Sequence, residues 1–581
     1  MAKRWRMATY DPVLLARLEK VAKVNTVVAQ LLLSRGIDCP ERARQFIDAK
    51  LSGLRDPDEL PGAVQAAELL YRAVRDRKSI VIYGDYDADG MTASAILLRC
   101  LRLLKASVST YVPHRFDEGY GLNCGALDQL AAKGAQVVVT VDNGIASLNE
   151  ADHARRLGLQ LIVTDHHQMR ERLPDADAIV HPALPAANYP FPGLCGAAVA
   201  LKVAWAVCRQ ACGERQVTPA MRNMLLDGVS LAAIGTVADV VPLLDENRVL
   251  VRQGLTTLSA QPPVGIEALL QVANMEGKSQ LAGDDLAFMI APRLNAAGRL
   301  GQAELGVELL ATDDPARAAE LANYINELNN QRQSIERSVL LAARKQVKRQ
   351  CNIDRDGALV LADHDWHAGV IGIVAGKLVE QYDRPVVLIS QDKLGVRPGI
   401  GSGRSVPGFD LHQALAECSE YLVSHGGHAA AAGLRIEEAK VEGFRRAFCE
   451  VAGLHIVPEQ RVGEIVVDAE APFVALTQRT VADIEQLAPF GQGNRRPLLC
   501  AGGVHLAGPP RLLGGSGRHL AVDLQQDGIR LRGVAFGGGD WADELAQVTG
   551  PLSIAFQPVI NRFRGRVSVE LHLADWKRDE S

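Results

Sequence analysis

The chain has 581 residues, of which 48% are hydrophobic and 23% are charged, which is typical of a globular protein with room for three or four domains. Its formal net charge is −5, so the chain as a whole is not a basic nucleic-acid binder, and any such surface must be a local patch. No apolar run reaches the ~18 residues of a membrane helix. No apolar segment of the kind found in signal peptides follows the basic start, so we expect a cytoplasmic protein with no membrane partner.

Neither the N-terminal residues nor the cysteines show a catalytic pattern. Residues 1–78 contain two helical stretches around a turn-rich connector, and we expect them to form a helical appendage to the first large domain. The ten cysteines are scattered, and no Cys-x-x-Cys pair occurs. This spacing favours reduced thiols and argues against a disulfide framework and a structural zinc site.

Three acidic residues follow the first strong strand signal, in the stretch Ser79-Ile-Val-Ile-Tyr-Gly-Asp-Tyr-Asp-Ala-Asp-Gly90. Asp85, Asp87 and Asp89 lie between this strand and a helical stretch, and open α/β sheets place their ligands at that position. Three clustered carboxylates cannot all stay ionised without a cation, and hard oxygen ligands suit Mg²⁺ or Mn²⁺. The alternatives are a solvated acidic turn and, more weakly, an EF-hand, whose bidentate Glu is missing because Ile96 stands in its place.

The same arrangement repeats as strands and helices alternate up to about residue 242, a pattern that predicts a parallel sheet. A second strand ends at Asp142, a third ends in Asp165-His166-His167, and Asp239 lies in a fourth apolar segment. Because strand carboxyl ends share one edge of a parallel sheet, we expect these side chains to converge. Taken singly, each has another reading: a turn residue for Asp142, surface or core histidines, and a helix cap for Asp239.

Two further regions follow in the middle of the chain. Residues 315–350 contain no internal Pro or Gly after Asp314-Pro315, which predicts one helix of about 50 Å that joins two domains. A second α/β domain follows, with the glycine-rich segments Gly401-Ser402-Gly-Arg404-Ser and His425-Gly-Gly-His428. Backbone N–H groups, a hydroxyl and a guanidinium suit a phosphate, although each segment alone would more often be a simple glycine-rich turn.

The last part of the chain, residues 463–578, is rich in short strands and glycine turns, which predicts a small β-barrel. Basic and aromatic side chains alternate in Asn561-Arg562-Phe563-Arg564-Gly-Arg566. OB-folds hold single strands by stacking bases on aromatic rings and pairing the backbone with cations. An ordinary hairpin with a solvated basic face is the alternative.

These motifs together resemble those of the DHH phosphoesterase superfamily. The resemblance rests on Gly84–Gly90, Val141–Gly144, Asp165–His167 and Gly235–Leu243, and it continues through Pro292–Leu300, Trp366–Val374, Gly401–Ser405, His425–His428 and Leu487–Asn494. It implies two α/β domains, a DHH parallel-sheet domain and a DHHA1-like domain, joined by the long helix, and a C-terminal OB-fold. The expected segments are 1–78, 79–245 (catalytic), 246–314 (completing the core), 315–350 (connecting helix), 351–455 (substrate binding) and 463–578 (OB-fold).

The resemblance also implies roles for individual residues. Asp142 would bridge two ions, Asp87 would bind one, and Asp89, His166 and Asp239 would bind the other, with Asp85 as a further ligand. His167 would face the scissile phosphate, and Asp165 would orient a histidine. The two ions would be Mn²⁺ or Mg²⁺. The substrate-binding residues would be Arg115, Arg293, Asn295, His367, Ser402, Arg404, His425, His428, Arg562, Phe563 and Arg564.

Within the superfamily the chain is most similar to bacterial exonucleases. The resemblance implies a single-stranded-DNA-specific 5′→3′ exonuclease of recombination and repair, acting as a monomer with a single-stranded-DNA-binding protein and a RecQ-type helicase as partners. A phosphoesterase for short oligonucleotides or cyclic dinucleotides is the nearest rival, but it would lack the barrel at 463–578. A catalytically inactive scaffold is the other rival, and the complete acid and histidine set argues against it.

Overall fold

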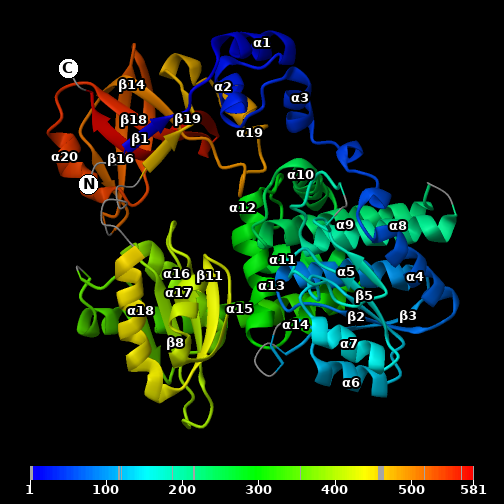
Figure 1. Cartoon of the computed structure of the whole chain (residues 1–581). Helices are drawn as coiled ribbons and strands as arrows, with labels where there is room; N and C mark the ends of the chain where they lie inside the picture. The colour runs from blue at the N-terminus through cyan, green and yellow to red at the C-terminus, as the bar shows by residue number, and fades with distance from the viewer. Residues whose placement is uncertain are drawn as a thin grey trace.

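The computed structural model describes residues 4–114, 118–119, 121–185, 188–213, 216–353, 355–455, 464–515, 517–563 and 565–579. Figure 1 shows a helix-rich first lobe, a second α/β lobe beside it and a C-terminal β-rich lobe next to the N-terminal helices. Within the described ranges, no helix is both long and apolar enough to cross a membrane.

The first lobe is built on a five-stranded parallel sheet in the order β3-β2-β4-β5-β6. The strands are β2 (Ser79–Tyr83), β3 (Ser107–Tyr111), β4 (Val137–Thr140), β5 (Gln160–Thr164) and β6 (Ala178–Val180). Alternate strand residues enter two cores: Ile80 and Ile82 pack in one, whereas Val81 and Tyr83 pack in the other. This two-sided burial explains why the inner strands β2, β4 and β5 are rich in Val, Ile and Leu, whereas the edge strand β3 is more polar and more exposed.

Helices cover both faces of this sheet. Residues of α6 (Cys124–Ala132) and α7 (Leu148–Arg156) fill the core on one face. The larger core on the other face is built from α4 (Ala63–Arg75), α5 (Ala88–Leu103), α8 (Gly196–Cys212) and α9 (Pro219–Ala238). It is extended by α10 (Asp245–Ala260), α11 (Val264–Val272), α12 (Gly283–Asp285), the π-helical turn η3 (Leu286–Ile290), α13 (Ala291–Arg299) and α14 (Ala303–Ala311).

The predicted long helix is α15 (Pro315–Gln350), with 36 residues and a cap in which Asp314 accepts hydrogen bonds from Ala316 and Arg317. Its first half, including Ile325, packs in the core of the first lobe, and its second half, including Val347, packs in a core of the second lobe. The helix therefore joins the two lobes by belonging to both cores.

The second lobe carries a mixed five-stranded sheet in the order β10-β11-β9-β8-β7. Only β7 and β8 are parallel, and the other neighbours are antiparallel. Its strands are β7 (Leu359–Asp363), β8 (Val386–Ser390), β9 (Gly399–Arg404), β10 (Leu422–Gly427) and β11 (Ala431–Ile436). Its helices are α16 (Ala368–Tyr382), α17 (Leu411–Glu417) and α18 (Val441–His455).

The C-terminal lobe is a β-barrel, as predicted. The order of its strands is β13-β14-β18-β19-β17-β16-β15, and an additional β14–β16 pairing closes the sheet. The strands are β13 (Ala469–Glu470), β14 (Leu499–Leu506), β15 (Arg511–Leu513), β16 (His519–Gln526), β17 (Ile529–Ala535), β18 (Leu552–Phe563) and β19 (Arg566–Arg578), with helices α19 (Gln478–Glu485) and α20 (Ala542–Ala546).

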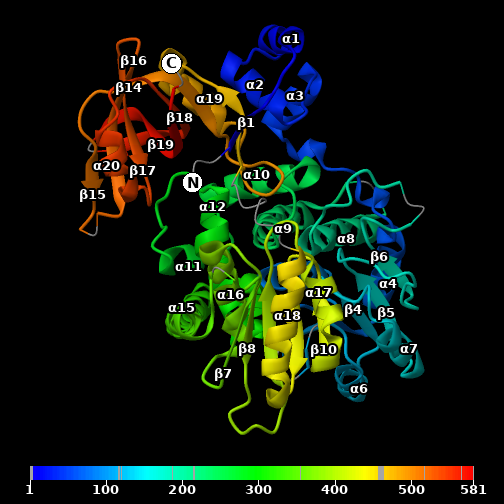
Figure 2. The same cartoon turned by 60° about the vertical axis from the view of Figure 1, so that its left-hand side comes forward.

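The N-terminal residues pack elsewhere than the sequence led us to expect. Leu18, Val28 and Leu32 share one core with Phe473 and Leu487 of the C-terminal lobe, and both views show the N-terminal helices beside α19 (Figures 1 and 2). The elements are β1 (Arg4–Met7), which pairs with β12 (Glu464–Val467), and α1 (Pro12–Ala22), α2 (Thr26–Ser34) and α3 (Pro40–Asp48). The expected attachment to the first large domain is wrong for this part, because an apolar helix face does not specify which surface covers it.

Candidate metal centre

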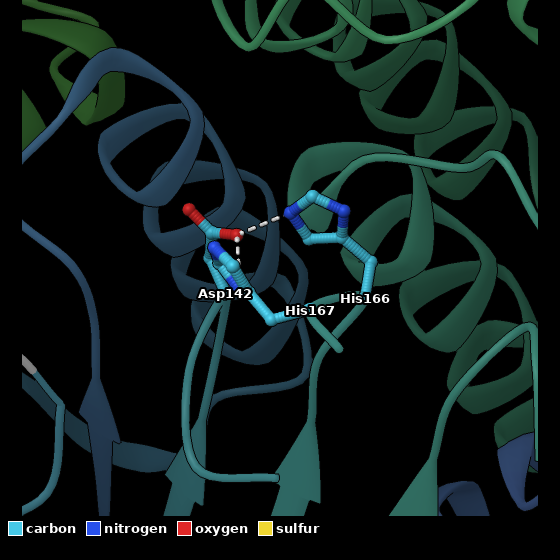
Figure 3. A group of neighbouring side chains, drawn as sticks. All are labelled: Asp142, His166 and His167. Atoms are coloured by element: carbon cyan, nitrogen blue, oxygen red, sulfur yellow. Dashed lines mark ion pairs between the residues drawn. The ribbon is translucent and has the colours of Figure 1, made fainter. Parts of the chain in front are cut away.

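Acidic and imidazole side chains meet where β2, β4 and β5 end. Asp85 follows β2 by two residues, Asp142 follows β4 by two, and His166 follows β5 by two. These three strands are neighbours in the sheet, so their carboxyl ends lie side by side. Figure 3 shows Asp142, His166 and His167 directed toward one another above the strand ends. The convergence that the sequence pattern predicts is therefore present.

Asp142 lies at the middle of the cluster. Its residue is only 2% exposed, its φ is +64°, and its Oδ1 lies 3.0 Å from Nε2 of His166 and 3.9 Å from Nδ1 of His167. Three sets of ligand atoms are close enough together to hold a cation: Asp85, Asp87 and Asp142; Asp142, His166 and His167; and Asp89, His166 and Asp239. Asp142 and His166 each belong to two sets.

Asp239 reaches the cluster from a helix rather than from a strand. It is the residue that ends α9, so the helix-cap reading of this position is the one the fold adopts. Its Oδ2 nevertheless lies 3.6 Å from Nε2 of His166. The run around it is apolar because α9 is buried over much of its length, and a short apolar segment does not distinguish a helix from a strand.

Backbone N–H groups hold several of these carboxylates. Asp87 caps α5 by accepting from the N–H groups of Asp89 and Gly90 at 2.9 and 3.0 Å. Asp89 accepts from Gly196 and Ala197 at the start of α8, at 2.7 and 2.9 Å. The first turn of a helix presents N–H groups that have no partner within the helix and attract anions. The sequence reasoning missed this contribution of α8, although its first glycine was the available signal.

Glycines make room for the acids. A Cβ at Gly196 would lie 2.6 Å from Cγ of Asp142, and a Cβ at Gly235 would collide with Oδ1 of Asp89. A side chain at either position would therefore displace a carboxylate. Gly235 belongs to the Gly235–Leu243 motif, in which the sequence analysis assigned a role only to Asp239.

The electrostatics of the acids suit a cation. Burial and then the neighbouring carboxylates raise the pKa of Asp239 to about 8 and that of Asp89 to about 6, and they raise the pKa of Asp142 well above its usual range. A divalent ion would remove this mutual repulsion and keep the acids ionised. Carboxylates with a single imidazole form a donor set that suits Mn²⁺ or Mg²⁺, so the residues present fit such an ion.

The surroundings shift the pKa values of the two histidines in opposite directions. Burial and the neighbouring His167 lower the pKa of His166 to about 3, which leaves it neutral, as a metal ligand must be. Burial opposes a charge on His167, but a hydrogen bond and charge attraction from Asp165 raise its pKa to about 9. Nδ1 of His167 lies 2.7 Å from Oδ1 of Asp165, which also accepts from the backbone N–H of both histidines.

Two predicted substrate residues of α13 are engaged within the protein. Oδ1 of Asn295 accepts a hydrogen bond from the N–H of Ala88 at 2.8 Å, at the start of α5. Arg293 donates to Oδ1 of Asn326 and to the carbonyl of Met289. Both interactions support the helices around the acids, so these two side chains hold structure in the described state.

Three predicted residues of the second lobe gather at the first turn of α16. His367 caps that helix by accepting from the N–H of Gly369. Nη1 of Arg404 donates to Oγ of Ser402 at 3.3 Å. A Cβ at Gly372 would lie 2.8 Å from that Oγ and 3.1 Å from Nη2 of Arg404. The glycine therefore lets the hydroxyl and the guanidinium lie against the helix.

Arg299 was not predicted, but it reaches the same turn from the first lobe. It is the last residue of α13, and its Nη1 donates to the carbonyl of Gly369 at 3.0 Å. The sequence signal was its place in the Pro-Arg-Leu-Asn-Ala-Ala-Gly-Arg segment that resembled the superfamily.

The remaining predicted substrate residues are dispersed. His425 is half-buried in β10, and His428 is exposed in the following turn. Arg562 and Phe563 are exposed at the end of β18, and Phe563 is 64% exposed. Arg115 and Arg564 lie outside the described residues. None of these four described residues belongs to the sets of possible metal ligands.

Comparison with known families accounts for all three lobes. Residues 79–233 match the model of the DHH family N-terminal domain, residues 355–453 match the DHHA1 domain, and residues 467–575 match the RecJ OB domain. These ranges follow the parallel sheet, the mixed sheet and the barrel described above.

Full-length relatives are also similar. The chain is 37% identical to the single-stranded-DNA-specific exonuclease RecJ of Escherichia coli over 95% of each protein. Two crystal structures of RecJ from Thermus thermophilus, in complex with Mn²⁺ and with Mg²⁺, are 32% and 31% identical in sequence, with TM-scores of 0.83 and 0.78. Each alignment covers 100% of this chain and about four-fifths of the other, 80% and 79%.

Proposed function

Because the chain belongs to the RecJ family and is a metal-dependent, single-stranded-DNA-specific exonuclease, we propose that it degrades DNA from the 5′ end with two divalent cations. The observation that supports two ions is the place of Asp142, whose carboxylate belongs to two of the possible ligand sets. A shared carboxylate of this kind is what a pair of ions ~4 Å apart requires.

We assign the ligands to two groups. Asp85, Asp87 and Asp142 would hold one ion, and Asp89, His166, Asp239 and the shared Asp142 would hold the other. When bound, such ions activate water, orient the phosphate and stabilise the leaving oxygen. The protein's own contribution is to keep Asp87 and Asp89 in place through backbone N–H groups and to keep His166 neutral.

His167 would hold the scissile phosphate. Against the cost of burial, the hydrogen bond and charge of Asp165 raise the pKa of its imidazole and favour the form in which both ring nitrogens carry protons. Nδ1 faces Asp165, and the proton on the other nitrogen would be offered to a phosphate oxygen. Asp165 would fix the ring orientation, as carboxylates beside histidines commonly do.

The first turn of α16 would bind the substrate on the opposite side. Arg404, Ser402 and Arg299 meet there, and a helix start with arginines beside it is a favourable place for a phosphate. A single strand that lies between this turn and the acids would be held from both lobes. Selection against a duplex would then be steric.

We further propose the setting in which the enzyme acts. All ten cysteines are unpaired, which suits the reducing cytoplasm. By family resemblance, a single-stranded-DNA-binding protein and a RecQ-type helicase would be its partners in recombination and repair, and it would act as a monomer. Light scattering tests the monomer, and pull-down with each purified partner tests the contacts.

Digestion of end-labelled DNA tests the central proposal. Single and double strands labelled at the 5′ or the 3′ end would be incubated with Mg²⁺, Mn²⁺ or a chelator. We expect release of the 5′ label from single strands first, and only with a divalent ion. Early release of the 3′ label would overturn the polarity, and equal cleavage of a dinucleotide and a long strand would favour an oligonucleotide phosphoesterase.

A further inference from the structure

One segment of the C-terminal lobe lies against the part of the chain that carries Asp239. Residues 486–494, here called the 486–494 turn, include the Pro-Phe-Gly-Gln-Gly-Asn segment noted in the sequence, for which the activity described above provides no role. The backbone N–H of Leu243 donates to the carbonyl of Gln492 at 2.8 Å. This bond lies four residues after Asp239, in the segment between α9 and α10 that we call the 240–244 connector.

Asp239 differs from three of the neighbouring acids in how it is held. Asp87, Asp89 and Asp165 each accept hydrogen bonds from backbone N–H groups. Among the described residues, no hydrogen bond reaches the carboxylate of Asp239, and its Oδ2 lies 3.6 Å from Nε2 of His166. The position of this carboxylate therefore depends on its backbone, at the end of α9 and the start of the 240–244 connector.

The backbone beside Asp239 is strained. Val240 has a φ of +58° and is 65% exposed, and Asp245 at the other end of the connector has a φ of +47°. A β-branched residue rarely adopts the left-handed region. Such conformations persist only where the surroundings determine them, and they concentrate at functional sites. Because Val240 is exposed, its own side chain does not supply that constraint.

The 486–494 turn supplies it through close backbone contact. A Cβ at Gly491 would lie 2.7 Å from Cδ1 of Leu243, and a Cβ at Gly493 would lie 3.3 Å from Cβ of Pro242 and from Cγ of Leu244. Leu243 itself is buried. The two glycines therefore allow the turn to cover three consecutive residues of the connector.

The turn is rigidly held from the other side. The side-chain amide of the buried Asn494 donates to the carbonyls of Leu487 and Pro489 at 2.9 and 2.7 Å. Arg35 of α2 donates to Oδ1 of Asn494 at 2.9 Å. The buried Arg248 of α10 donates to the carbonyl of Leu487 at 2.8 Å.

We propose that the 486–494 turn is a positioning element for Asp239, through which the C-terminal lobe tunes the affinity of the catalytic centre for its metal. The inference rests on the metal centre proposed above. It makes the barrel lobe part of the catalytic apparatus as well as a surface for DNA, because Leu487 and Phe490 of the turn that holds the connector also pack in the barrel core.

Gly491→Ala tests the proposal, with Gly508→Ala as its matched control. Both glycines have φ values that alanine accepts, but a Cβ at Gly508 meets nothing within 4 Å. In the metal-free protein, we expect the peptide over residues 239–245 to exchange its amide hydrogens faster in the Gly491→Ala variant and at the parental rate in the Gly508→Ala variant. This readout does not depend on activity.

Mn²⁺ titration by calorimetry provides the second readout. We expect the Mn²⁺ dissociation constant of Gly491→Ala to rise on the order of tenfold, the usual effect of losing support for a ligand, while single-strand affinity stays near that of the parent. Its lost activity should return at high Mn²⁺ concentration. Adding Leu243→Ala to this variant removes the collision and should restore part of the affinity.

Equal Mn²⁺ constants and equal exchange in the two glycine variants would overturn the proposal. If Gly491→Ala does not fold, Asn494→Asp replaces it, since a carboxylate cannot donate to Leu487 and Pro489. An unchanged Mn²⁺ constant there would be equally decisive. Failure of the parent itself to bind Mn²⁺ would instead overturn the proposed metal centre.

Discussion

The two five-stranded sheets of this chain carry different chemistry because their strands run differently. In the parallel sheet, side chains after β2, β4 and β5 meet at one edge, so acids far apart in the sequence form a single buried cluster. In the mixed sheet, where only β7 and β8 are parallel, the strand ends are divided between the two edges, and the groups near α16 come from one strand, one helix start and Arg299. Parallel strands concentrate ligands for cations, whereas the mixed sheet presents scattered donors suited to a phosphate.

The largest effect should come from removing the shared acid of the parallel sheet. We expect Asp142→Ala to lower kcat on the order of 10³-fold or more, because several kcal/mol of transition-state stabilisation would be lost with the metal geometry. Single-strand binding, followed by fluorescence anisotropy, should survive. Activity within about tenfold of the parent would contradict the bridging role, since electrostatic stabilisation of this kind is worth far more than one factor of ten.

Substitution of Arg404 in β9 tests whether the lobe with the mixed sheet binds a substrate phosphate. A charge-assisted, bidentate contact is worth roughly 1.5–3 kcal/mol, so Arg404→Ala should raise KM on the order of ten- to a hundredfold for a 5′-phosphorylated single strand. Arg404→Lys should recover only part of this, because a point charge does not reproduce the planar fork. Steady-state kinetics decide the matter: a parental KM in both variants would remove Arg404 from the substrate site.

Substitution of Asn295 distinguishes a structural role at the start of α5 from a role in substrate binding. Asn295→Ala leaves the N–H of the buried Ala88 without its acceptor, which should cost ~2 kcal/mol of unfolding free energy. Urea unfolding measures this loss, and KM should stay near the parental value. The opposite pattern, a raised KM with unchanged stability, would return Asn295 to the list of substrate residues.

The smallest effect should come from the barrel, at the end of β18 in the β18–β19 hairpin. Phe563→Ala should weaken binding of a long single strand by about fivefold, the lower end of the range for base stacking on an exposed ring, and leave cleavage of a very short oligonucleotide unchanged. Gel-shift titration and a short-substrate assay measure the two. Equal losses on both substrates would indicate a folding role for the hairpin.

DNA binding by the barrel is tested with a point substitution because the N-terminal helices pack in the barrel core. Deleting residues 463–581 would seem the simpler test of the barrel. It would also uncover Leu18, Val28 and Leu32, which share the barrel's core. Exposed apolar surface of this kind promotes association, so the deletion would confound DNA binding with loss of folding.

Much of the candidate metal centre could be predicted from the sequence, because the pattern that places its residues acts over a few positions. A strand followed by acids determines which edge those acids occupy, and a repeat of that pattern on neighbouring strands determines that they meet. Asp85, Asp142 and His166 were therefore placed by pattern alone. For Asp239 the sequence offered its helix-cap position only as an alternative reading, since the apolar run around it has no distinctive period.

By itself the sequence determined the parallel sheet, the length of α15, the barrel and the acids at the strand ends, because hydrophobic period, capping residues and turn glycines act over a few residues. Only the tertiary structure decided that residues 4–48 pack on the barrel, that α8 donates its N–H groups to Asp89, and that the 486–494 turn lies against the connector after Asp239. Each of these contacts joins segments about 100 to more than 400 residues apart. Their energies depend on complementary surfaces that exist only once both partners have folded, and no local pattern encodes that match.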